Sequence, residues 1–418
     1  MTRAAAPPQD IESPYAWMRL AVSLLLMTIG GSGMYSVTVV LPRIQADFAV
    51  DRGGASLPYT LTMVGFGIGG VLMGRLSDRF GVIVPVLLGA FGLGAGFIAA
   101  GAATTLWQFS LAQGVLIGLL GTSATFAPLV ADTSQWFDRR RGIALAICMS
   151  GNYVAGAVWP PVMQHFIDSV GWRTTYVGMG VFCFLAILPL ALVLRRRPPS
   201  QPQPVALAGS ATLRSSLQPP LVLGMPAGAV QTLLCVAGVS CCVAMSMPQV
   251  HIVAYCGDLG YGVARGAEML SLMLGFGIVS RVASGFIADR IGGVRTLLLG
   301  SVLQGTALVM YTLFDGLFSL YVISALFGLF QGGIVPSYAI IVREYFSPKE
   351  AGTRVGLVLM ATLLGMALGG WMSGVIFDFT GSYQAAFLNG IAWNLVNVSI
   401  MVWLLMRSRG RPAFAPAV

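Results

Sequence analysis

One arginine, Arg281, lies where a cation is costly, within the apolar stretch GFGIVSRVASGFIADRIGG of residues 275–293. It precedes Asp289, where we expect this helix to leave the membrane, so at about 1.5 Å per residue it sits roughly 12 Å inside the boundary. A charged side chain near the centre of a membrane helix costs roughly 2.5–3.5 kcal/mol even on lenient insertion scales. Arg281 must therefore face a water-filled cavity or a partner.

The acidic residues offer Arg281 no obvious partner at its own depth. None of the 15 Asp and Glu lies near the middle of a long apolar segment, and the nearest, Asp132, Asp258 and Glu268, lie at segment ends. A guanidinium keeps its proton at any working pH, and its planar fork matches a carboxylate through two parallel hydrogen bonds. We therefore predict that Arg281 binds a substrate carboxylate. The alternative is a structural arginine satisfied by backbone carbonyls and water.

The composition predicts an all-α polytopic membrane protein. Of 418 residues, 56% are hydrophobic and 9% charged, and the mean hydropathy is +0.81, whereas soluble domains carry about 25% charged residues. An apolar segment of roughly 20 residues spans a bilayer as a helix. Twelve transmembrane helices are expected, at about 17–42, 52–74, 82–102, 107–134, 142–167, 173–194, 230–257, 266–288, 294–313, 317–342, 353–377 and 383–406.

The distribution of basic residues predicts the orientation. With both termini inside, most of the 24 Lys and Arg, including the clusters at 139–141 and 195–197, fall in inner loops, tails or helix ends. This asymmetry places the N- and C-termini in the cytoplasm of a protein of the cell (inner) membrane. It also accounts for the net charge of +9 without nucleic acid, because the basic clusters face the anionic lipid bilayer.

The sequence repeats itself at an offset near 210 residues. GRLSDRFG at 74–81 is repeated as GFIADRIG at 285–292, and WFDRRRG at 136–142 corresponds to YFSPKEAG at 345–352. We therefore expect two parallel six-helix halves. The predicted organisation is a cytoplasmic N-terminal tail (1–16), a first half (17–194), a Pro- and Ser-rich cytoplasmic linker (195–229), a second half (230–406) and a cytoplasmic C-terminal tail (407–418).

The loop GRLSDRFG, with its echo after the eighth segment, resembles the signature Gly-x-x-x-Asp-Arg-x-Gly of the major facilitator superfamily. The resemblance covers nearly the whole chain and implies two six-helix halves that rock about a site at the bilayer midplane. It also implies that Asp78, Arg79, Asp289 and Arg290 form a cytoplasmic gate; the alternative is that they are loop turns and membrane anchors. VIVP at 82–85 replaces the usual basic residues, which predicts a weaker gate in the first half.

The eighth segment narrows the resemblance. RVASGFIADRIG is similar to the eighth helix of the monocarboxylate-transporter and oxalate/formate-exchanger branches, where an Arg stands four residues before a Gly, as Arg281 and Gly285 do. Gly277 replaces an Asp that often precedes this Arg by one turn. The eleventh segment lacks the Lys that supplies a second cation in the oxalate exchanger. One cation suits one carboxylate, which favours a monocarboxylate substrate.

Six further residues inside the segments are candidates for the substrate site: Tyr35, Phe126, Asn152, Tyr153, Gln331 and Tyr338. Asn152 and Tyr153 can donate hydrogen bonds either to a substrate or between helices. Tyr35 matches a cavity-lining position of the family, with an ordinary buried tyrosine as the alternative.

The seventh segment carries His251, Tyr255 and Asp258 on one helical face, by spacing of four and three. A histidine changes charge near neutral pH, and the resemblance gives the charge at Asp258 a part in proton coupling to Arg281. We predict that Asp258 and His251 take part in proton coupling. The alternative is a polar helix end exposed to water.

The predicted function is secondary active transport of small organic anions, by proton-coupled uptake of a lactate- or pyruvate-like monocarboxylate. The sequence contains no nucleotide motif, metal-ligand cluster or catalytic triad, so no enzyme activity, cofactor or metal is expected, and the protein is expected to act as a monomer. The alternatives are an anion exchanger without proton coupling, a multidrug/proton antiporter, and a non-transporting membrane sensor. An antiporter would be expected to carry a mid-segment acid, and a sensor an added soluble domain.

Overall fold

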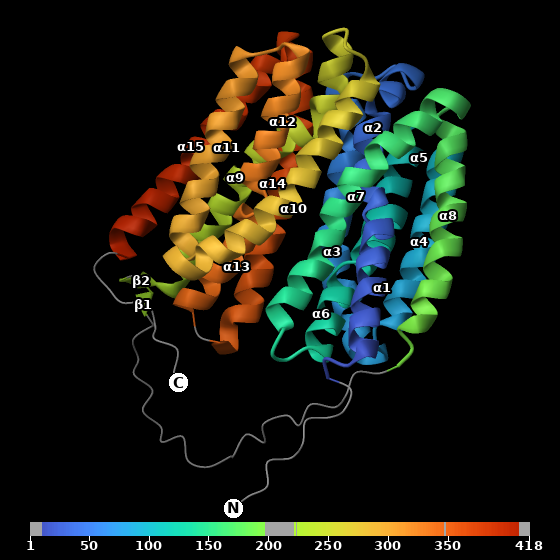
Figure 1. The fold of residues 1–418 in the computed structure, drawn as a ribbon. Coiled ribbons are helices and arrows are strands. Elements are labelled where there is room, and N and C mark those ends of the chain that lie inside the picture. Colours follow the sequence, from blue (N-terminus) through green and yellow to red (C-terminus); the bar gives the residue numbers. More distant parts are fainter. Residues whose placement is uncertain (1–10, 197–220, 223, 347, 409–418) are drawn as a thin grey trace, which may run out of the picture.

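The computed structural model describes residues 11–196, 221–222, 224–346 and 348–408. Within these residues, 12 helical spans are long and apolar enough to cross a membrane, so the protein is an all-α, multi-pass membrane protein of two six-helix halves (Figure 1). Most of the predicted linker 195–229, and parts of the tails 1–16 and 407–418, lie outside the described residues.

Six spans form the first half: α1 (Pro14–Gly30) with α2 (Ser32–Asp47), α3 (Arg52–Phe80), α4 (Ile83–Ala102), α5 (Leu106–Leu111) with η1 (Ala112–Thr122) and α6 (Ala127–Trp136), α7 (Arg141–Val170), and α8 (Trp172–Val193). The short strands β1 (Leu221–Val222) and β2 (Met225–Pro226) pair antiparallel before the second half. The second half contains α9 (Ala227–Asp258), α10 (Val263–Ile291), α11 (Gly293–Leu313), α12 (Leu317–Gln331) with α13 (Ile334–Tyr345), α14 (Pro348–Thr380), and α15 (Tyr383–Ser408).

The sequence repeat is also a repeat of backbone conformation. The repeated loops end α3 and α10 at Gly81 and Gly292, both with φ of 84°. Gly171 and Gly381, which follow α7 and α14, also have positive φ, of 84° and 65°. Because this left-handed conformation favours glycine, matching glycines stop matching helices in the two halves.

The two halves touch at one end of the bundle and separate at the other. We call the end where α1 begins and α15 ends the terminal end, and the opposite end the distal end (Figure 1). The halves meet along α3–α14 and α7–α10. A Cβ placed at Gly374 of α14 would lie 2.7 Å from the Arg52 carbonyl oxygen at the distal end of α3, and one at Gly67 would lie 2.8 Å from Met360 Sδ.

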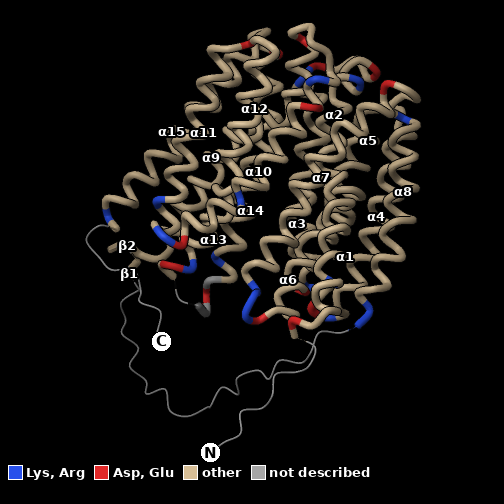
Figure 2. Tube along the Cα trace, in the orientation of Figure 1, with Lys and Arg blue, Asp and Glu red and all other residues tan. Residues whose placement is uncertain are grey.

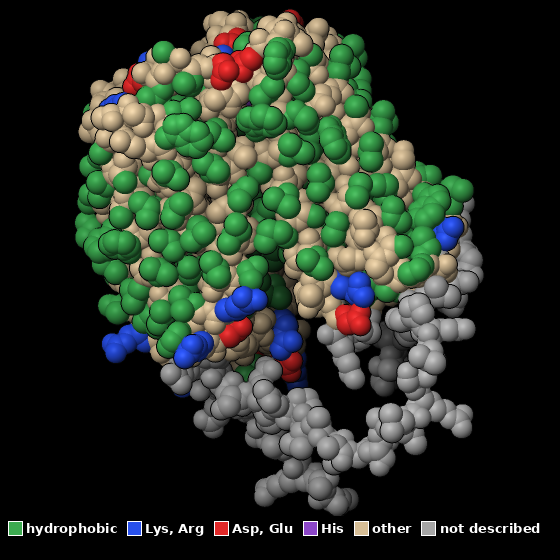
Figure 3. All heavy atoms as spheres, turned by 180° about the vertical axis from the view of Figure 1, so that it is seen from behind, with side chains coloured by type: hydrophobic (Ala, Val, Ile, Leu, Met, Phe, Trp, Pro, Cys, Tyr) green, Lys and Arg blue, Asp and Glu red, His purple; other side chains and the backbone are tan. Residues whose placement is uncertain are grey.

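Nearer the terminal end, glycines on these same helices meet nothing across the interface. A Cβ at Gly70, Gly74, Gly285 or Gly356 would have no neighbouring atom within 4 Å. Figure 3 shows the corresponding recess between the halves at this end, below a broad apolar band. Charged residues gather at the two ends of the bundle (Figure 2), as expected for a helical bundle with a lipid-facing waist.

One buried ion pair stabilises the first half near the terminal end. Arg19 donates from Nε and Nη2 to the two Asp132 carboxylate oxygens, both at 2.8 Å, and the two side chains are 2% and 4% exposed. Arg19 Nη1 donates to the Tyr15 hydroxyl and the Arg196 carbonyl. Asp132, one of the acids nearest in depth to Arg281 in the sequence, therefore already has an arginine partner.

We expect Asp132→Asn to destabilise the protein by about 3–5 kcal/mol, because it leaves the buried Arg19 cation uncompensated. The measurement is thermal unfolding of detergent-solubilised protein. Asp138→Asn is the matched control, since Asp138 is 73% exposed and lies 4.0 Å from Arg141. Equal unfolding temperatures for the two variants would contradict the structural role of the Arg19–Asp132 pair.

Candidate functional site

Arg281 extends from α10 of the second half to α7 of the first. Its Nη1 donates to the Met149 carbonyl oxygen at 3.3 Å, and the guanidinium carbon lies 4.5 Å from the centre of the Tyr153 ring. Its Nε is buried without a hydrogen-bond partner among the described residues. A buried donor normally has a partner, so one carbonyl and one ring leave the guanidinium incompletely satisfied.

Two glycines of α10 show that Arg281 lies at the boundary between the closed and open parts of the interface between the halves. One turn toward the distal end, a Cβ at Gly277 would overlap the Tyr153 ring. Only glycine therefore lets this ring lie against α10 and beneath the guanidinium. One turn toward the terminal end, a Cβ at Gly285 would meet nothing within 4 Å, so the recess reaches Arg281 from that side.

Tyr35 and Asn152 approach the same region from the first half. A Cβ at Gly156 would lie 2.7 Å from Tyr35 Cζ, one turn of α7 beyond Tyr153. The same Cβ at Gly156 would overlap Leu274 of α10, so Tyr35 lies where α7 meets α10, the helix that carries Arg281. Asn152 Oδ1 points toward the α1–α2 break, where a Cβ at Gly31 would be 3.2 Å away. Arg281, Tyr153 and Tyr35 thus form one cluster, with Asn152 beside it.

The other three predicted binding residues have different neighbours. Phe126 packs edge-on against Phe66 within the first half, with ring centres 5.5 Å apart. Gln331 accepts a hydrogen bond from Gln249 at 3.0 Å, and its own Nε2 is buried without a partner in the described part of the chain. The fully buried Tyr338 donates to Asn397 at 3.1 Å inside the second half. None of the interactions among the described residues joins these three side chains to Arg281.

At the distal end, Arg52 joins the two halves. Its Nη2 donates to Asp258 Oδ1 at 3.2 Å and its Nη1 to the Tyr383 hydroxyl at 2.6 Å, and Nη1 lies 3.0 Å from Asp258 Oδ2 in an ion pair. The Asp378 carboxylate accepts from the backbone N–H groups of Arg52 and Gly53, at 2.8 and 2.6 Å, and so caps α3 from the opposite half. We call Arg52, Asp258, Asp378 and Tyr383 the distal lock.

The resemblance implies that Asp258 takes part in proton coupling to Arg281, but the structure places the two residues far apart. Asp258 is the last residue of α9, at the distal end, and its partner is Arg52. Arg281 lies 18 residues into α10, which begins at Val263, or roughly 27 Å along the helix axis. This separation is close to the roughly 30 Å thickness of the hydrocarbon core, so direct contact between the two charges is excluded in this conformation.

His251 connects to the distal lock through Tyr383. The Tyr383 hydroxyl lies 3.3 Å from His251 Nδ1, and His251 Nε2 lies 2.8 Å from the Gly370 carbonyl oxygen. The carbonyl can only accept, so Nε2 carries the proton and Nδ1 accepts from Tyr383 in a neutral imidazole. Arg52, Tyr383, His251 and the α14 backbone thus form a hydrogen-bonded chain.

The four predicted gate residues lie at the terminal end, two on each half. Asp78 and Arg79 end α3, Asp289 and Arg290 end α10, and the four side chains are at least partly exposed. No ion pair among the described residues includes them. This lack of ion pairs is consistent with the recess between the halves at the terminal end, whereas the distal lock joins the halves at the closed end.

This geometry defines a class of protein. A charged site lies between two repeated six-helix halves, open toward one end and closed by ion pairs at the other, which is the arrangement of transporters that work by alternating access. The model of the Major Facilitator Superfamily matches residues 22–319 and 269–417. The chain belongs to this superfamily, whose members are transporters and not enzymes.

The chain is similar to transporters of animals and fungi. Monocarboxylate transporter 13 of Bos taurus is 28% identical over 415 residues, which cover 97% of this chain and 92% of that protein. The Rattus norvegicus protein of the same name is 28% identical over 361 residues, covering 84% and 78%. The MFS-type transporter pynF of Aspergillus niger is 25% identical over 315 residues, covering 74% and 69%.

Among solved structures, a bacterial homologue of the human lysosomal transporter Spinster, in an inward-facing and occupied conformation, shares the fold. The TM-score is 0.72 at 15% sequence identity, over 97% of this chain and 100% of that chain. A mutant of the nucleoside transporter NupG matches with a TM-score of 0.70 at 14% identity, over 93% and 99%.

We expect Arg52→Gln to increase the population open at the distal end by about tenfold or more, because it removes the cation that holds Asp258 (about 1.4 kcal/mol per factor of ten). Spin labels introduced by Ser169→Cys and Thr380→Cys, exposed distal positions on opposite halves, would report longer distances by double electron–electron resonance. Arg43→Gln, which removes an exposed pair within the first half, is the control. Unchanged distances in Arg52→Gln would remove the lock from the transport cycle.

Proposed function

We propose that the protein transports small monocarboxylates, of the lactate or pyruvate type, by alternating access, with Arg281 as the anchor of the substrate carboxylate. The observation that carries the proposal is the incompletely satisfied guanidinium of Arg281 at the inner limit of the recess. A carboxylate that displaces the Met149 carbonyl can accept from two guanidinium nitrogens at once, which a single carbonyl oxygen cannot do.

The surroundings of Arg281 favour a short anion with one charge. In the cluster described above, the neighbours Tyr35, Tyr153 and Asn152 are neutral hydrogen-bonding groups. They suit the hydroxyl or keto oxygen of a small acid, whereas a second carboxylate would lack a second cation. The names of the animal relatives, monocarboxylate transporters, support the same substrate class.

In the proposed transport cycle, the protein alternates between a conformation closed at the distal end and one closed at the terminal end. From the structure described here, substrate release or entry takes place at the terminal end, which we assign to the cytoplasm of a cell (inner) membrane. Opening of the distal end requires Arg52 to leave Asp258, Asp378 and Tyr383. Closure of the terminal end brings Asp78, Arg79, Asp289 and Arg290 together as the opposing gate. Each half carries its own helices as a unit, so a monomer suffices.

We expect Arg281→Lys to lower kcat/KM for labelled monocarboxylate uptake into proteoliposomes at least about tenfold. A lysine cannot form the bidentate pair, and a hydrogen bond to a charged group contributes about 1.5–3 kcal/mol. Arg265→Lys, at an exposed distal arginine, is the control. Uptake at the rate of the unsubstituted protein in Arg281→Lys would make Arg281 structural and remove the basis of the monocarboxylate assignment.

Proton coupling is proposed to act at the distal lock. Moving a monovalent anion inward against the membrane potential costs about 2.3 kcal/mol per 100 mV, and a co-transported proton removes this cost. A proton on Asp258 would abolish its charge attraction to Arg52, so protonation from the distal side would release the lock as the site becomes accessible. His251 is connected to the same lock by its hydrogen bond with Tyr383, and we assign it a part in proton transfer there.

We expect Asp258→Asn to retain exchange of labelled for unlabelled monocarboxylate but to lose acceleration of net uptake by an imposed inward proton gradient. Both fluxes are measured in the same proteoliposome preparation. Asp168→Asn, at the exposed acid that occupies the repeat position of Asp378 in the first half, should keep the acceleration. A gradient response that survives in Asp258→Asn would leave exchange or a different proton carrier as the mechanism.

A further inference from the structure

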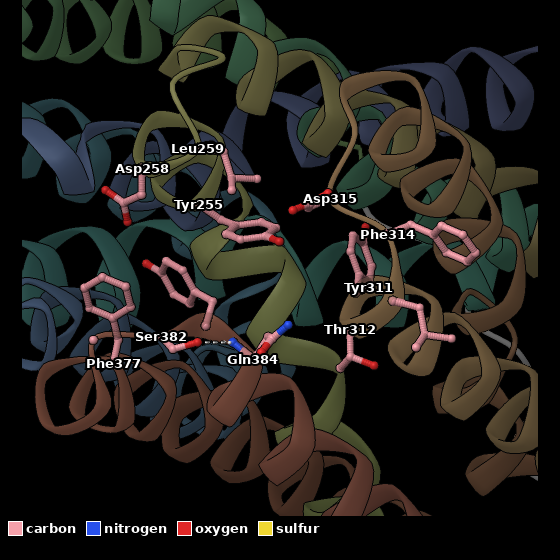
Figure 4. Close-up of a pocket in the computed structure, with 13 residues that line it drawn as sticks. Tyr255, Asp258, Leu259, Tyr311, Thr312, Phe314, Asp315, Phe377, Ser382 and Gln384 are labelled. Carbon is pink, nitrogen blue, oxygen red and sulfur yellow. Dashed lines mark hydrogen bonds between the residues drawn. The ribbon is translucent and has the colours of Figure 1, made fainter.

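A separate cavity of about 380 Å³ opens at the distal end, and its lining residues all belong to the second half. They come from the distal ends of α9, α11, α14 and α15 and from the α11–α12 loop, and they include Tyr255, Asp258, Tyr311, Asp315, Phe377 and Tyr383 (Figure 4). The volume is in the range of small-molecule sites. It is distinct from the Arg281 cluster, which lies between the halves.

The chemistry of this distal pocket is acidic and aromatic. Two carboxylates, Asp258 and Asp315, line it, and no lysine or arginine is among its described lining residues. Asp258 is shared with Arg52 from the first half. In the described part of the chain, the Asp315 carboxylate takes part in no ion pair or hydrogen bond; only its backbone carbonyl does, accepting from Tyr261. The pocket therefore presents negative charge to any occupant.

A second observation is the hydroxyl of Tyr255. This side chain is only 9% exposed, and its hydroxyl has no hydrogen-bond partner among the described residues, although its ring packs edge-on against Tyr383 and Phe387. Figure 4 shows the hydroxyl directed into the space between Tyr311 and Asp315. The hydroxyl oxygen itself is not fully buried, so an occupant of the pocket can reach it.

The other tyrosine hydroxyls around the pocket are already used. Tyr311 bonds to Ser324 at 2.8 Å, and its ring stacks on Phe387 with centres 5.0 Å apart. Tyr383 accepts from Arg52 and lies 3.3 Å from His251 Nδ1. Among the described lining residues, the polar side-chain groups without a hydrogen-bond partner are the Tyr255 hydroxyl, the Asp315 carboxylate and the Gln384 amide, set beside aromatic rings.

We propose that this distal pocket binds a small organic cation of the aryl-alkyl ammonium class. Its ammonium group donates hydrogen bonds to the Asp315 carboxylate and the Tyr255 hydroxyl, and its apolar part contacts the aromatic walls. A cation next to aromatic faces and a carboxylate is favoured by both attractions, whereas an anion meets the unpaired Asp315 carboxylate. The site thus has the opposite charge preference from Arg281 and does not depend on the proposed monocarboxylate function.

The distal pocket also communicates with the distal lock through Asp258. All lining residues lie in one half, so a rigid rocking motion preserves the pocket but withdraws Arg52 from Asp258. A bound cation therefore interacts more strongly with the protein when the distal end is open. By linkage, it shifts the population toward that state.

The test is equilibrium binding of radiolabelled 2-phenylethylammonium to the full-length protein in nanodiscs of zwitterionic lipid. Neutral 2-phenylethanol and anionic phenylacetate, of similar size, serve as competitors. We expect saturable binding that neither competitor displaces. Asp315→Asn should weaken it at least about tenfold and Tyr255→Phe about fivefold. Asp168→Asn, at an exposed distal acid of the other half, and Arg281→Lys should leave it unchanged.

The variant Arg52→Gln tests whether the distal pocket prefers a positively charged ligand. Removing this arginine frees Asp258, so cation binding should become at least about threefold tighter. Weaker binding in Arg52→Gln, equal competition by 2-phenylethanol, or full binding in Asp315→Asn would each overturn the proposal. Loss of cation binding in Arg281→Lys would overturn it as well, because it would place the probe at the anion site.

Discussion

A guanidinium cannot lose its charge, and a membrane interior accepts it only beside water or a hydrogen-bond acceptor. Arg281 meets this constraint by lying where the interface between the halves changes from contact to separation. On its distal side the Tyr153 ring occupies the space that Gly277 leaves, and on its terminal side Gly285 faces open space. The position of this one cation thus depends on how both halves pack, and any motion of one half against the other changes what the cation meets.

The two ends of the bundle hold the halves together by different means. At the distal end, the Arg52 side chain of the first half contacts a carboxylate and a hydroxyl of the second half. A second carboxylate of the second half caps the helix that Arg52 begins. At the terminal end, four charges remain separate and at least partly exposed. Because ionic contacts at both ends cannot form at once in a rigid two-body motion, the energies of the two sets decide the balance between the conformations.

The helices and the two-half organisation are predictable from the sequence because local signals determine them. Long apolar segments specify membrane helices, and glycines such as Gly81 and Gly292 fix where matching helices stop. The depth of Arg281 follows from counting along a single helix. The clustering of Tyr35 and Tyr153 around it is consistent with the predicted binding site, whose role in transport stays a prediction.

The distal lock is not predictable in the same way. In the sequence Arg52 looks like an ordinary charge at the start of a helix, and its side chain is buried because it packs against Asp258 and Tyr383, 206 and 331 residues away. The local signal in the sequence is that Asp378 lies in the last turn of its helix, at the repeat position of Asp168. Likewise, the shared helical face of His251 and Asp258 was correct as geometry, but a single helix gives no information on which distant arginine Asp258 meets.

The buried pair of Arg19 and Asp132 has a consequence for biosynthesis. The two residues are 113 positions apart, and translation proceeds at about 5–20 residues per second, so roughly 6 to 23 s separate their synthesis. During this interval the first helix is in the translocon or the bilayer with a cation whose acidic partner does not yet exist. Arg19 lies near the start of its helix, where a long side chain can reach the interface. The order of membrane insertion is thus compatible with this ion pair, because Arg19, which is synthesised before Asp132, lies close enough to the interface to be hydrated until Asp132 is inserted.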